Sequence, residues 1–144
     1  MKLTIREACI EDAGAIRALN TEEMGYDYPL ERTREKLALL INRETDKVYV
    51  AVVGENIVGY VHANHYELLY APAMKNIMGI AVSGKYCRCG IGKALLESVE
   101  KWATESGAEG VRLVSGGTRI GAHQFYRSMG YGEGRQQLNF KKKL

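Results

Sequence analysis

A glycine-rich turn carries the residues best suited to bind an anion. Ile80–Val82 has the apolar pattern of a buried strand, and Gly90–Gly92 begins the most regular amphipathic stretch of the chain. Backbone N–H groups in the first turn of a helix lack intrahelical acceptors, and glycine leaves them open to phosphate oxygens. Positive charge around the turn comes from Lys85, Arg88 and Lys93. The stretch predicts a phosphate-binding helix N-terminus, with a helix start that binds no ligand as the alternative.

Two other phosphate motifs do not fit this turn. A dinucleotide-binding G-x-G-x-x-G would need a third glycine at position 95, where the chain has Leu95. A P-loop would need glycine and a hydroxyl where the chain has Cys87 and Ala94. Residue identity therefore excludes both motifs.

Two histidines and two carboxylates are candidate bases for proton transfer. His62 and His65 fall on the strand expected over residues 57–66. Neutral imidazole is suited to removing a proton from an ammonium group near neutral pH. Side chains alternate along a strand, so the two histidines are expected on opposite faces and at most one faces a substrate. The carboxylate alternatives are Glu67 and Glu23.

An acidic and aromatic segment joins the first two predicted helices. It contains Glu22, Glu23, Tyr26, Asp27 and Tyr28. Carboxylates attract an amine cation, and tyrosine rings contact cations through their faces. The segment is a candidate amine site; the alternative is a solvated loop whose tyrosines fold onto the core.

The cysteines do not predict a metal site. Cys87 and Cys89 form a C-x-C pair with no further His or Cys nearby in sequence, whereas a closed zinc site needs four ligands. Three cysteines cannot all pair within one chain. We expect reduced thiols, with Cys9 in the core.

The elements that must position these residues follow the order β-α-α-β-β-β-α-β-α-β. Strands are expected over residues 3–7, 48–53, 57–66, up to 82, 111–115 and around Leu138 and Phe140. Helices are expected to begin at Glu11-Asp12, near Pro29 and at Gly90, and a short last helix carries Ala122, Phe125, Tyr126 and Met129. This order predicts an α/β fold in which helices lie on the faces of a mixed sheet. No linker or internal repeat interrupts it, so one domain over residues 1–144 is expected.

Composition and charge exclude several classes of protein. Lys and Arg number 20 against 17 Asp and Glu, and a net charge of +3 gives no reason to expect a nucleic-acid partner. The apolar stretches are shorter than the roughly 20 residues of a membrane span, and the first residues are unlike a signal peptide. A cytoplasmic protein without a membrane partner is expected. The sequence leaves the oligomeric state, monomer or homodimer, open.

Two motifs, in this order, resemble those of the GCN5-related N-acetyltransferase (GNAT) family. Val82–Leu96 is similar to its acyl-CoA turn, Arg/Gln-x-x-Gly-x-Gly/Ala after a strand that ends in valine. Ala122–Tyr131 is similar to its Ala-x-x-Phe-Tyr motif followed by Gly-Phe/Tyr. The resemblance covers nearly the whole chain. It implies a GNAT-like acyl-CoA N-acyltransferase fold, with a single N-acetyltransferase domain over residues 1–144.

The resemblance also implies a reaction. The acetyl group of acetyl-CoA would pass directly to the primary amine of a small molecule, with Tyr126 as the acid that protonates the CoA sulfur. The resemblance assigns no base; the residues themselves make His65 and Glu67 the catalytic candidates. Coenzyme A contacts would fall on Ile80, Ala81, Val82, Cys87, Arg88, Cys89, Gly90, Ile91, Gly92, Lys93, Arg119, Phe125 and Arg127. Acceptor contacts would fall on Glu23, Tyr26, Asp27, Tyr28 and His62. No metal is implied.

Several positions depart from the family pattern. The leading Arg/Gln falls at Cys87, with Arg88 displaced by one residue, and Gly84 stands where a proline is common. The acidic residue that many members carry before the turn is absent at Met78-Gly79. Two alternatives therefore stay open: an acyl-CoA-binding module with little or no catalysis, and a peptide or protein N-acetyltransferase.

Overall fold

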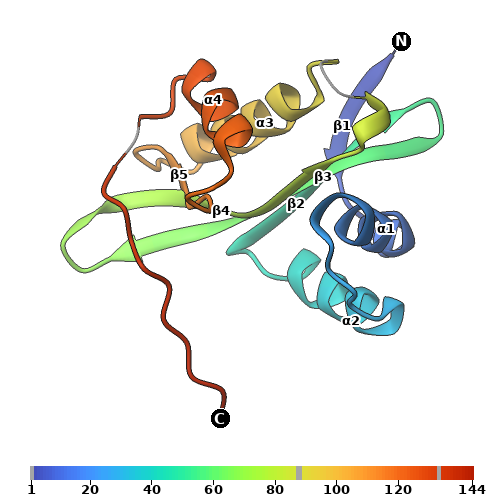
Figure 1. Cartoon of the computed structure of the whole chain (residues 1–144), viewed down its shortest axis with the longest axis horizontal. Helices are drawn as coiled ribbons and strands as arrows, with labels where there is room; N and C mark the ends of the chain where they lie inside the picture. The colour runs from blue at the N-terminus through green and yellow to red at the C-terminus, as the bar shows by residue number, and fades with distance from the viewer. Residues whose placement is uncertain (1, 87–88, 133) are drawn as a thin grey trace. The chain divides into compact units, whose positions relative to one another are not determined.

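The computed structural model describes residues 2–86, 89–132 and 134–144 (Figure 1). The chain divides into two compact units, Met1–Leu113 and Val114–Leu144. Each unit is described by itself.

A five-stranded mixed sheet forms the centre of the first unit. Its strands are β1 (Leu3–Glu7), β2 (Asp46–Val53), β3 (Asn56–Leu68), β4 (Ala71–Val82) and β5 (Val111–Leu113). They lie side by side in sequence order. The first four pair antiparallel, and β5 pairs parallel to β4. The predicted mixed sheet is therefore confirmed.

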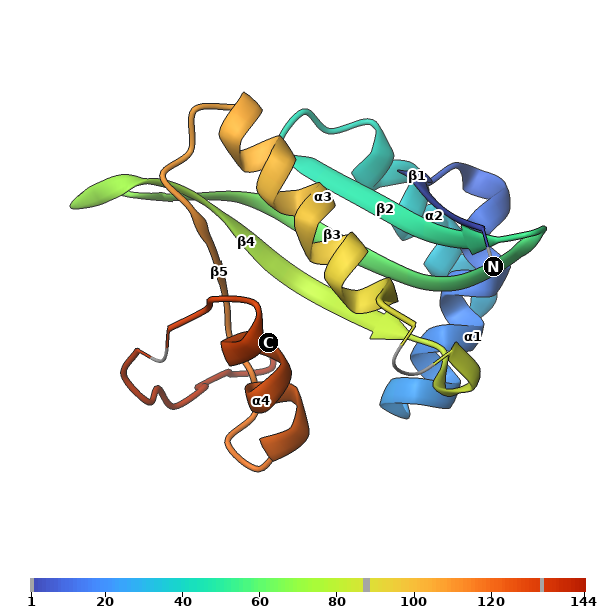
Figure 2. The ribbon, with the colours of Figure 1, turned by 90° about the horizontal axis from the view of Figure 1, so that it is seen from above.

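Helices cover both faces of this sheet. The 3-10 helix η1 (Ile10–Asp12) leads into α1 (Ala13–Met24), α2 (Leu30–Ile41) follows, and η2 (Gly84–Tyr86) precedes α3 (Ile91–Glu105). α1 and α2 lie on one face and α3 crosses the other (Figure 2). On the α1–α2 face, Ile16, Leu19 and Leu37 pack in one buried cluster with Val50 and Tyr60 of the sheet. The core on this face is therefore built from α1, α2 and the strands beneath them.

α3 packs against the sheet through an uninterrupted apolar stripe. Ile91, Leu95, Leu96 and Val99 are fully buried, at the three- and four-residue spacing of one helix face. Gly59 of β3 makes this close approach possible, because a Cβ there would lie 3.1–3.2 Å from atoms of β4 and α3. The position of the helix N-terminus over β3 and β4 thus depends on a residue without a side chain.

A β-bulge interrupts β4 shortly before its end. His62 pairs with Gly79 and Ala63 pairs with Ile77, so Met78 is the extra residue. β5 pairs only with residues 75–77. From Met78 to Val82, β4 therefore has no strand partner on that side within the described residues.

The second unit contains α4 (Ile120–Ser128). The predicted final strand is wrong: described residues 134–144 form no regular secondary structure, and Leu138 and Phe140 are 82% and 85% exposed. Alternating apolar residues stabilise a strand only where a neighbour accepts its backbone hydrogen bonds and a core accepts its side chains. The described tail has neither.

Local turn predictions agree with the backbone. Gly54, Gly107 and Gly130 have positive φ values, at the turn between β2 and β3 and at the ends of α3 and α4. Left-handed residues of this kind end helices, and glycine adopts them without steric cost. The prediction that Cys9 lies in the core is wrong, because this residue is exposed.

The described residues contain neither a membrane-spanning helix nor a metal-binding cluster. No helix there is both long and apolar enough to cross a lipid bilayer. No group of three or more His, Cys, Asp or Glu side chains in the described part of the chain is arranged to hold a metal ion.

Candidate active site

The glycine turn begins directly after β4. The Ser83 N–H donates to the Val58 carbonyl at 2.8 Å, which keeps the chain on β3 before it turns through η2. Gly90 caps α3 in the left-handed conformation, with φ of +78°. Ala94 donates to the Gly90 carbonyl at 3.0 Å. The N–H groups of residues 91–93 come before this bond in the helix, where backbone donors are oriented to bind an anion.

The structure describes two of the three basic residues that were predicted around this turn. Lys85 and Lys93 are exposed, one before and one inside the first turn of α3. Cys89 is also exposed. The predicted cofactor contacts Cys87 and Arg88 lie outside the described residues. Two cations and the helix dipole therefore favour a negatively charged group here.

The open edge of β4 adds two backbone donors beside the turn. The Ser83 N–H points to β3, and successive N–H groups of a strand point to opposite sides. The N–H groups of Val82 and Ile80 therefore point to the edge that β5 leaves unpaired. This orientation is compatible with the predicted role of Ile80 and Val82 beside the cofactor. A carbonyl oxygen at this edge could accept a hydrogen bond from either N–H group.

Tyr60 and Asn20 lie on the α1–α2 side of the same strands. The Tyr60 hydroxyl donates to Oδ1 of Asn20 on α1. A Cβ on Gly79 would lie 3.6 Å from this hydroxyl. Burial raises the pKa of the Tyr60 phenol to about 12, against the opposing effect of the Asn20 hydrogen bond. The hydroxyl is therefore protonated at neutral pH beside the bulge.

His62 forms a close pair with Asp46 next to this bulge. Its Nε2 lies 2.7 Å from Oδ2 of Asp46, and their side chains are 18% and 5% exposed. The Thr45 hydroxyl donates to the other carboxylate oxygen at 2.8 Å. Burial alone would raise the pKa of Asp46, but the hydrogen bonds from His62 and Thr45 outweigh it and the pKa is lowered. The ionised carboxylate makes Nε2 the donor, so Nδ1 carries the lone pair when the ring is neutral.

The other predicted base lies elsewhere. His65 stacks on Trp102 of α3, with ring centroids 5.6 Å apart, and Nζ of Lys75 lies 4.1 Å from the same ring. Trp102 is eleven residues beyond Ile91, about 16 Å along α3 from the glycine turn. Glu67 is exposed two residues further along β3. His62 and His65 lie on opposite faces as predicted, and the structure brings only His62 close to the bulge.

Glu23, predicted to contact the acceptor, contacts the glycine turn. Its Oε2 accepts a hydrogen bond from the Gly84 N–H at 3.0 Å. A proline at this position could not donate this bond, so the departure from the family pattern has a structural consequence. The end of α1 is therefore tied to the start of the cofactor turn.

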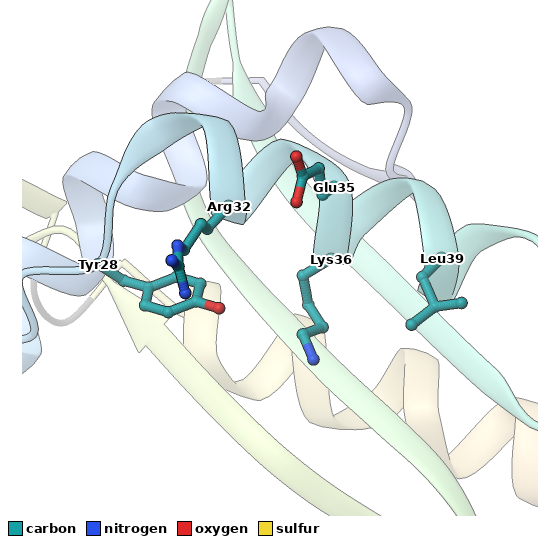
Figure 3. A pocket seen from close by; sticks show the side chains of 5 residues that line it. All are labelled: Tyr28, Arg32, Glu35, Lys36 and Leu39. Atoms are coloured by element: carbon teal, nitrogen blue, oxygen red, sulfur yellow. The ribbon is translucent and has the colours of Figure 1, made fainter.

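The rest of the predicted acceptor segment lies at the surface. Tyr26 is 63% exposed, and Asp27 pairs with Arg17 at 3.5 Å. Tyr28 lines a shallow pocket on the outer side of α2 together with Arg32, Glu35, Lys36 and Leu39 (Figure 3). Neither the glycine turn nor a histidine lines this pocket.

Tyr126 lies on α4 in the second unit. Its ring centroid is 5.4 Å from that of Phe125 and 6.3 Å from that of Tyr131. Burial raises the pKa of the Tyr126 phenol, and the nearby charge of Arg119 partly opposes this effect. The phenol is therefore protonated at neutral pH, as an acid must be.

The other predicted contacts of this unit are grouped on the same short helix. Arg119 is the N-cap residue of α4, Phe125 is half-buried, and Arg127 is exposed in the last turn. His123 Nε2 lies 2.9 Å from the Gly116 carbonyl.

Three pairs of contacting residues have no signal in the sequence. Asp46 lies 16 residues from His62, and Asn20 lies 40 residues from Tyr60. Arg112 contacts Asn76, which is 36 residues away. Strand pairing and helix packing create these contacts, so no local motif records them.

Comparison with known proteins identifies the class. The acetyltransferase (GNAT) family model matches residues 14–131. The chain therefore belongs to the acetyltransferase (GNAT) family, whose members bind acetyl-CoA. No curated protein matches its sequence.

Solved structures share the fold over almost the whole chain. A transcriptional regulator from Bacillus halodurans C-125 is 21% identical, with a TM-score of 0.88 over 98% of this chain and 100% of that one. AAC(6')-Iy, bound to the bisubstrate analogue CoA-S-monomethyl-acetylneamine, is 14% identical, with a TM-score of 0.89 over 100% of both chains. The aminoglycoside acetyltransferase meta-AAC0020, from an uncultured soil metagenomic sample and in complex with trehalose, is 27% identical. Its TM-score is 0.80 over 99% of this chain and 96% of that one.

Proposed function

We propose that this protein is an acetyl-CoA-dependent N-acetyltransferase that acetylates a primary amine of a small molecule. One observation carries the proposal: the unpaired edge of β4 at Ile80–Val82 leads into a helix N-terminus that begins at Gly90. Backbone donors along this edge and at the helix start match a long ligand with a polar arm and a phosphate group. The matched family and two aminoglycoside acetyltransferases of the same fold support it.

The cofactor would lie along residues 80–93, with Lys93 beside its phosphates and the Val82 N–H beside the thioester oxygen. When bound, acetyl-CoA supplies an activated acetyl group. The contribution of this chain is to hold the carbonyl beside a donor, so that negative charge developing on its oxygen is stabilised.

We assign the removal of the ammonium proton to His62. The bond between Nε2 and Asp46 leaves the lone pair of the neutral ring on Nδ1. His62 lies on β3, where it pairs with Gly79 of β4. The freed amine then attacks the carbonyl carbon, a C–N bond forms and the C–S bond breaks. The nitrogen loses its second proton to solvent, and the phenol of Tyr126 protonates the departing sulfur.

An amine panel assayed by release of free thiol tests the proposal. It contains polyamines, aminoglycosides, aminoalkylphosphonates, simple amines and peptides, each with acetyl-CoA. Product from small amines together with a raised Tm in CoA supports the proposal. A raised Tm without product from any amine indicates an acyl-CoA-binding module, and product from peptides alone indicates a peptide acetyltransferase.

A further inference from the structure

Arg112 forms a small polar cluster with Asn76 and Tyr66. Its Nη1 donates to Oδ1 of Asn76 at 2.6 Å, and its guanidinium carbon lies 4.2 Å from the centroid of the Tyr66 ring. All three side chains are half-buried. The cluster joins β3, β4 and β5, so the sheet itself holds the guanidinium in place.

The register places this cluster on the same face as His62. Asn76 pairs with Asn64 and with Arg112, and Asn64 pairs with Asp46. Cross-strand partners share a face, and Asp46 contacts His62. α3 lies on the opposite face, where it packs through Leu95 and Val99.

The charge of Arg112 has no carboxylate counterpart in the described part of the chain. No acidic oxygen among these residues lies within 4.0 Å of its guanidinium, whereas Arg6, Arg17 and Arg34 each have one. Its hydrogen-bond partner is a neutral amide, and its stacking partner is an aromatic ring. A guanidinium offers five N–H donors in a planar fork that fits the two oxygens of a carboxylate or phosphate. A half-buried arginine held in this way is therefore suited to an oxyanion.

That oxyanion does not belong to the phosphates of the cofactor. Asn76 precedes Val82 by six residues, which is about 20 Å along a strand. The phosphate-binding helix start lies beyond Val82, on the α3 face of the sheet. An anion at Arg112 therefore belongs to a different ligand.

We propose that Arg112, with Asn76 and Tyr66, binds an anionic group of the acceptor, so that the substrate is an amine that also carries a carboxylate or phosphate. This inference rests on the proposed acetyltransferase function. Asn64, level with Asn76, lies two residues from His62, a separation of about 7 Å. The amine and the anion are therefore several bonds apart, as in an ω-amino acid or an aminoalkyl phosphate.

Matched substrate pairs test the proposal. We would compare kcat/KM for 4-aminobutyrate against 4-aminobutanamide and for 3-aminopropyl phosphate against 3-aminopropanol, with neamine as a polycationic reference. In at least one pair, kcat/KM is expected to be at least tenfold higher for the anionic member than for its neutral analogue. Comparison of the two pairs shows whether the site prefers a carboxylate or a phosphate. Arg112→Gln should abolish the preference, and Arg112→Lys should keep part of it because the charge remains. Arg34→Gln makes the same change of charge on α2 and should leave the preference intact.

A second variant covers the case in which Arg112→Gln fails to fold. Asn76→Asp places a carboxylate beside Arg112, so that the guanidinium forms an ion pair within the protein. This variant should lose the preference for anionic amines without a lower Tm. A preference retained in Asn76→Asp, or absent from the wild type, overturns the proposal.

A binding measurement separates this proposal from the proposed function. The Arg112 Nε–H resonance of the CoA-loaded protein should shift when 3-aminopropyl phosphate or 4-aminobutyrate is added. A resonance that neither compound shifts overturns the anion site even if other amines are acetylated. Acetylation of no amine, with the resonance shifted, counts against the enzyme assignment and not against the site.

Discussion

At the scale of single residues, two side chains carry the proposed proton transfers, and each is prepared by its surroundings. His62 is oriented by a buried carboxylate at 2.7 Å, which sets its neutral tautomer. Tyr126 is held protonated because burial raises its pKa. Tyr126 therefore keeps a proton that it could donate, and the bond to Asp46 leaves Nδ1 of His62 as the nitrogen that could accept one.

Replacement of His62 should change the pH dependence of the reaction more than the fold. For His62→Gln we expect kcat/KM at pH 7 to fall about 100-fold, the usual contribution of a general base. The loss should shrink as pH rises toward the pKa of the acceptor, because the free amine then needs no base. Measured pH profiles decide the assignment: the same loss in His65→Gln, with none in His62→Gln, would move the base to His65.

Tyr126→Phe should slow turnover without weakening the cofactor complex. Phenylalanine keeps the ring contacts with Phe125 and Tyr131 and loses only the hydroxyl. We expect kcat to fall about tenfold to 100-fold while the Kd for CoA, measured by calorimetry, stays the same. Full activity of this variant at every pH would remove Tyr126 from the mechanism.

At the scale of elements, the site depends on how α3 meets the sheet. Gly59 lets the first turns of α3 approach β3, and the bulge at Met78 ends the regular part of β4 before the unpaired edge. Glu23 links the end of α1 to Gly84. The glycine turn is thus positioned by three separate elements rather than by its own sequence.

Gly59→Ala should loosen this arrangement. The new Cβ would meet the Ala81 carbonyl oxygen at 3.1 Å and side chains of α3 at 3.2 Å, so α3 must shift. We expect a loss of about 1–3 kcal/mol in the free energy of unfolding, measured in urea, together with weaker CoA binding. Gly14→Ala is the matched control: a Cβ there meets nothing within 4 Å, and alanine should stabilise α1 by up to about 1 kcal/mol. Equal stability of the two variants would contradict this account of α3.

Reversing one charge at the start of α3 tests the proposed phosphate site. Lys93→Glu places a carboxylate beside the expected phosphates while its charge suits the helix N-terminus, so the fold should persist. We expect the Kd for CoA to rise about tenfold. Lys101→Glu makes the same change of net charge further along α3 and should leave this Kd unaltered, as measured by calorimetry. Equal effects of both variants would point to general electrostatics instead of a local site.

At the scale of the whole molecule, two buried carboxylates link stability to pH. Burial alone would raise the pKa of Asp12, but hydrogen bonds from Arg6 and the Cys9 N–H outweigh it and the pKa falls below 3.8. The pKa of Asp46 is lowered in the same way by His62 and Thr45. The stabilisation is fully present above the unfolded value near 3.8 and is lost as pH falls through the lower folded values.

Acid should therefore destabilise the protein through these two sites. The free energy of unfolding in urea is expected to decline steeply below about pH 4, and Asp12→Asn with Asp46→Asn should flatten this decline. Asp27→Asn is the control, because Asp27 is 91% exposed. A decline that is as steep in the double variant as in the wild type would show that other groups cause it.

Local patterns in the sequence predict the glycine turn and the order of the α-helices and strands except for the final strand. The apolar stripe of α3 and the turns at Gly54, Gly107 and Gly130 are local patterns, and the two motifs that resembled GNAT acetyltransferases lie within short stretches. Local backbone preference and side-chain periodicity suffice for such features. The final strand was predicted from the same kind of pattern, but its formation depends on a partner, and the described tail has none.

Which polar side chains contact one another depends on strand pairing and helix packing. The pairs of His62 with Asp46 and of Arg112 with Asn76 join residues from different strands, and the bulge at Met78 sets which of them share a face. A shift of one residue in strand register would move every side chain to the other face of the sheet. The sequence supplied the candidate histidines and the glycine turn, and the register of β3 and β4 placed His62 beside the bulge and Arg112 on the same face.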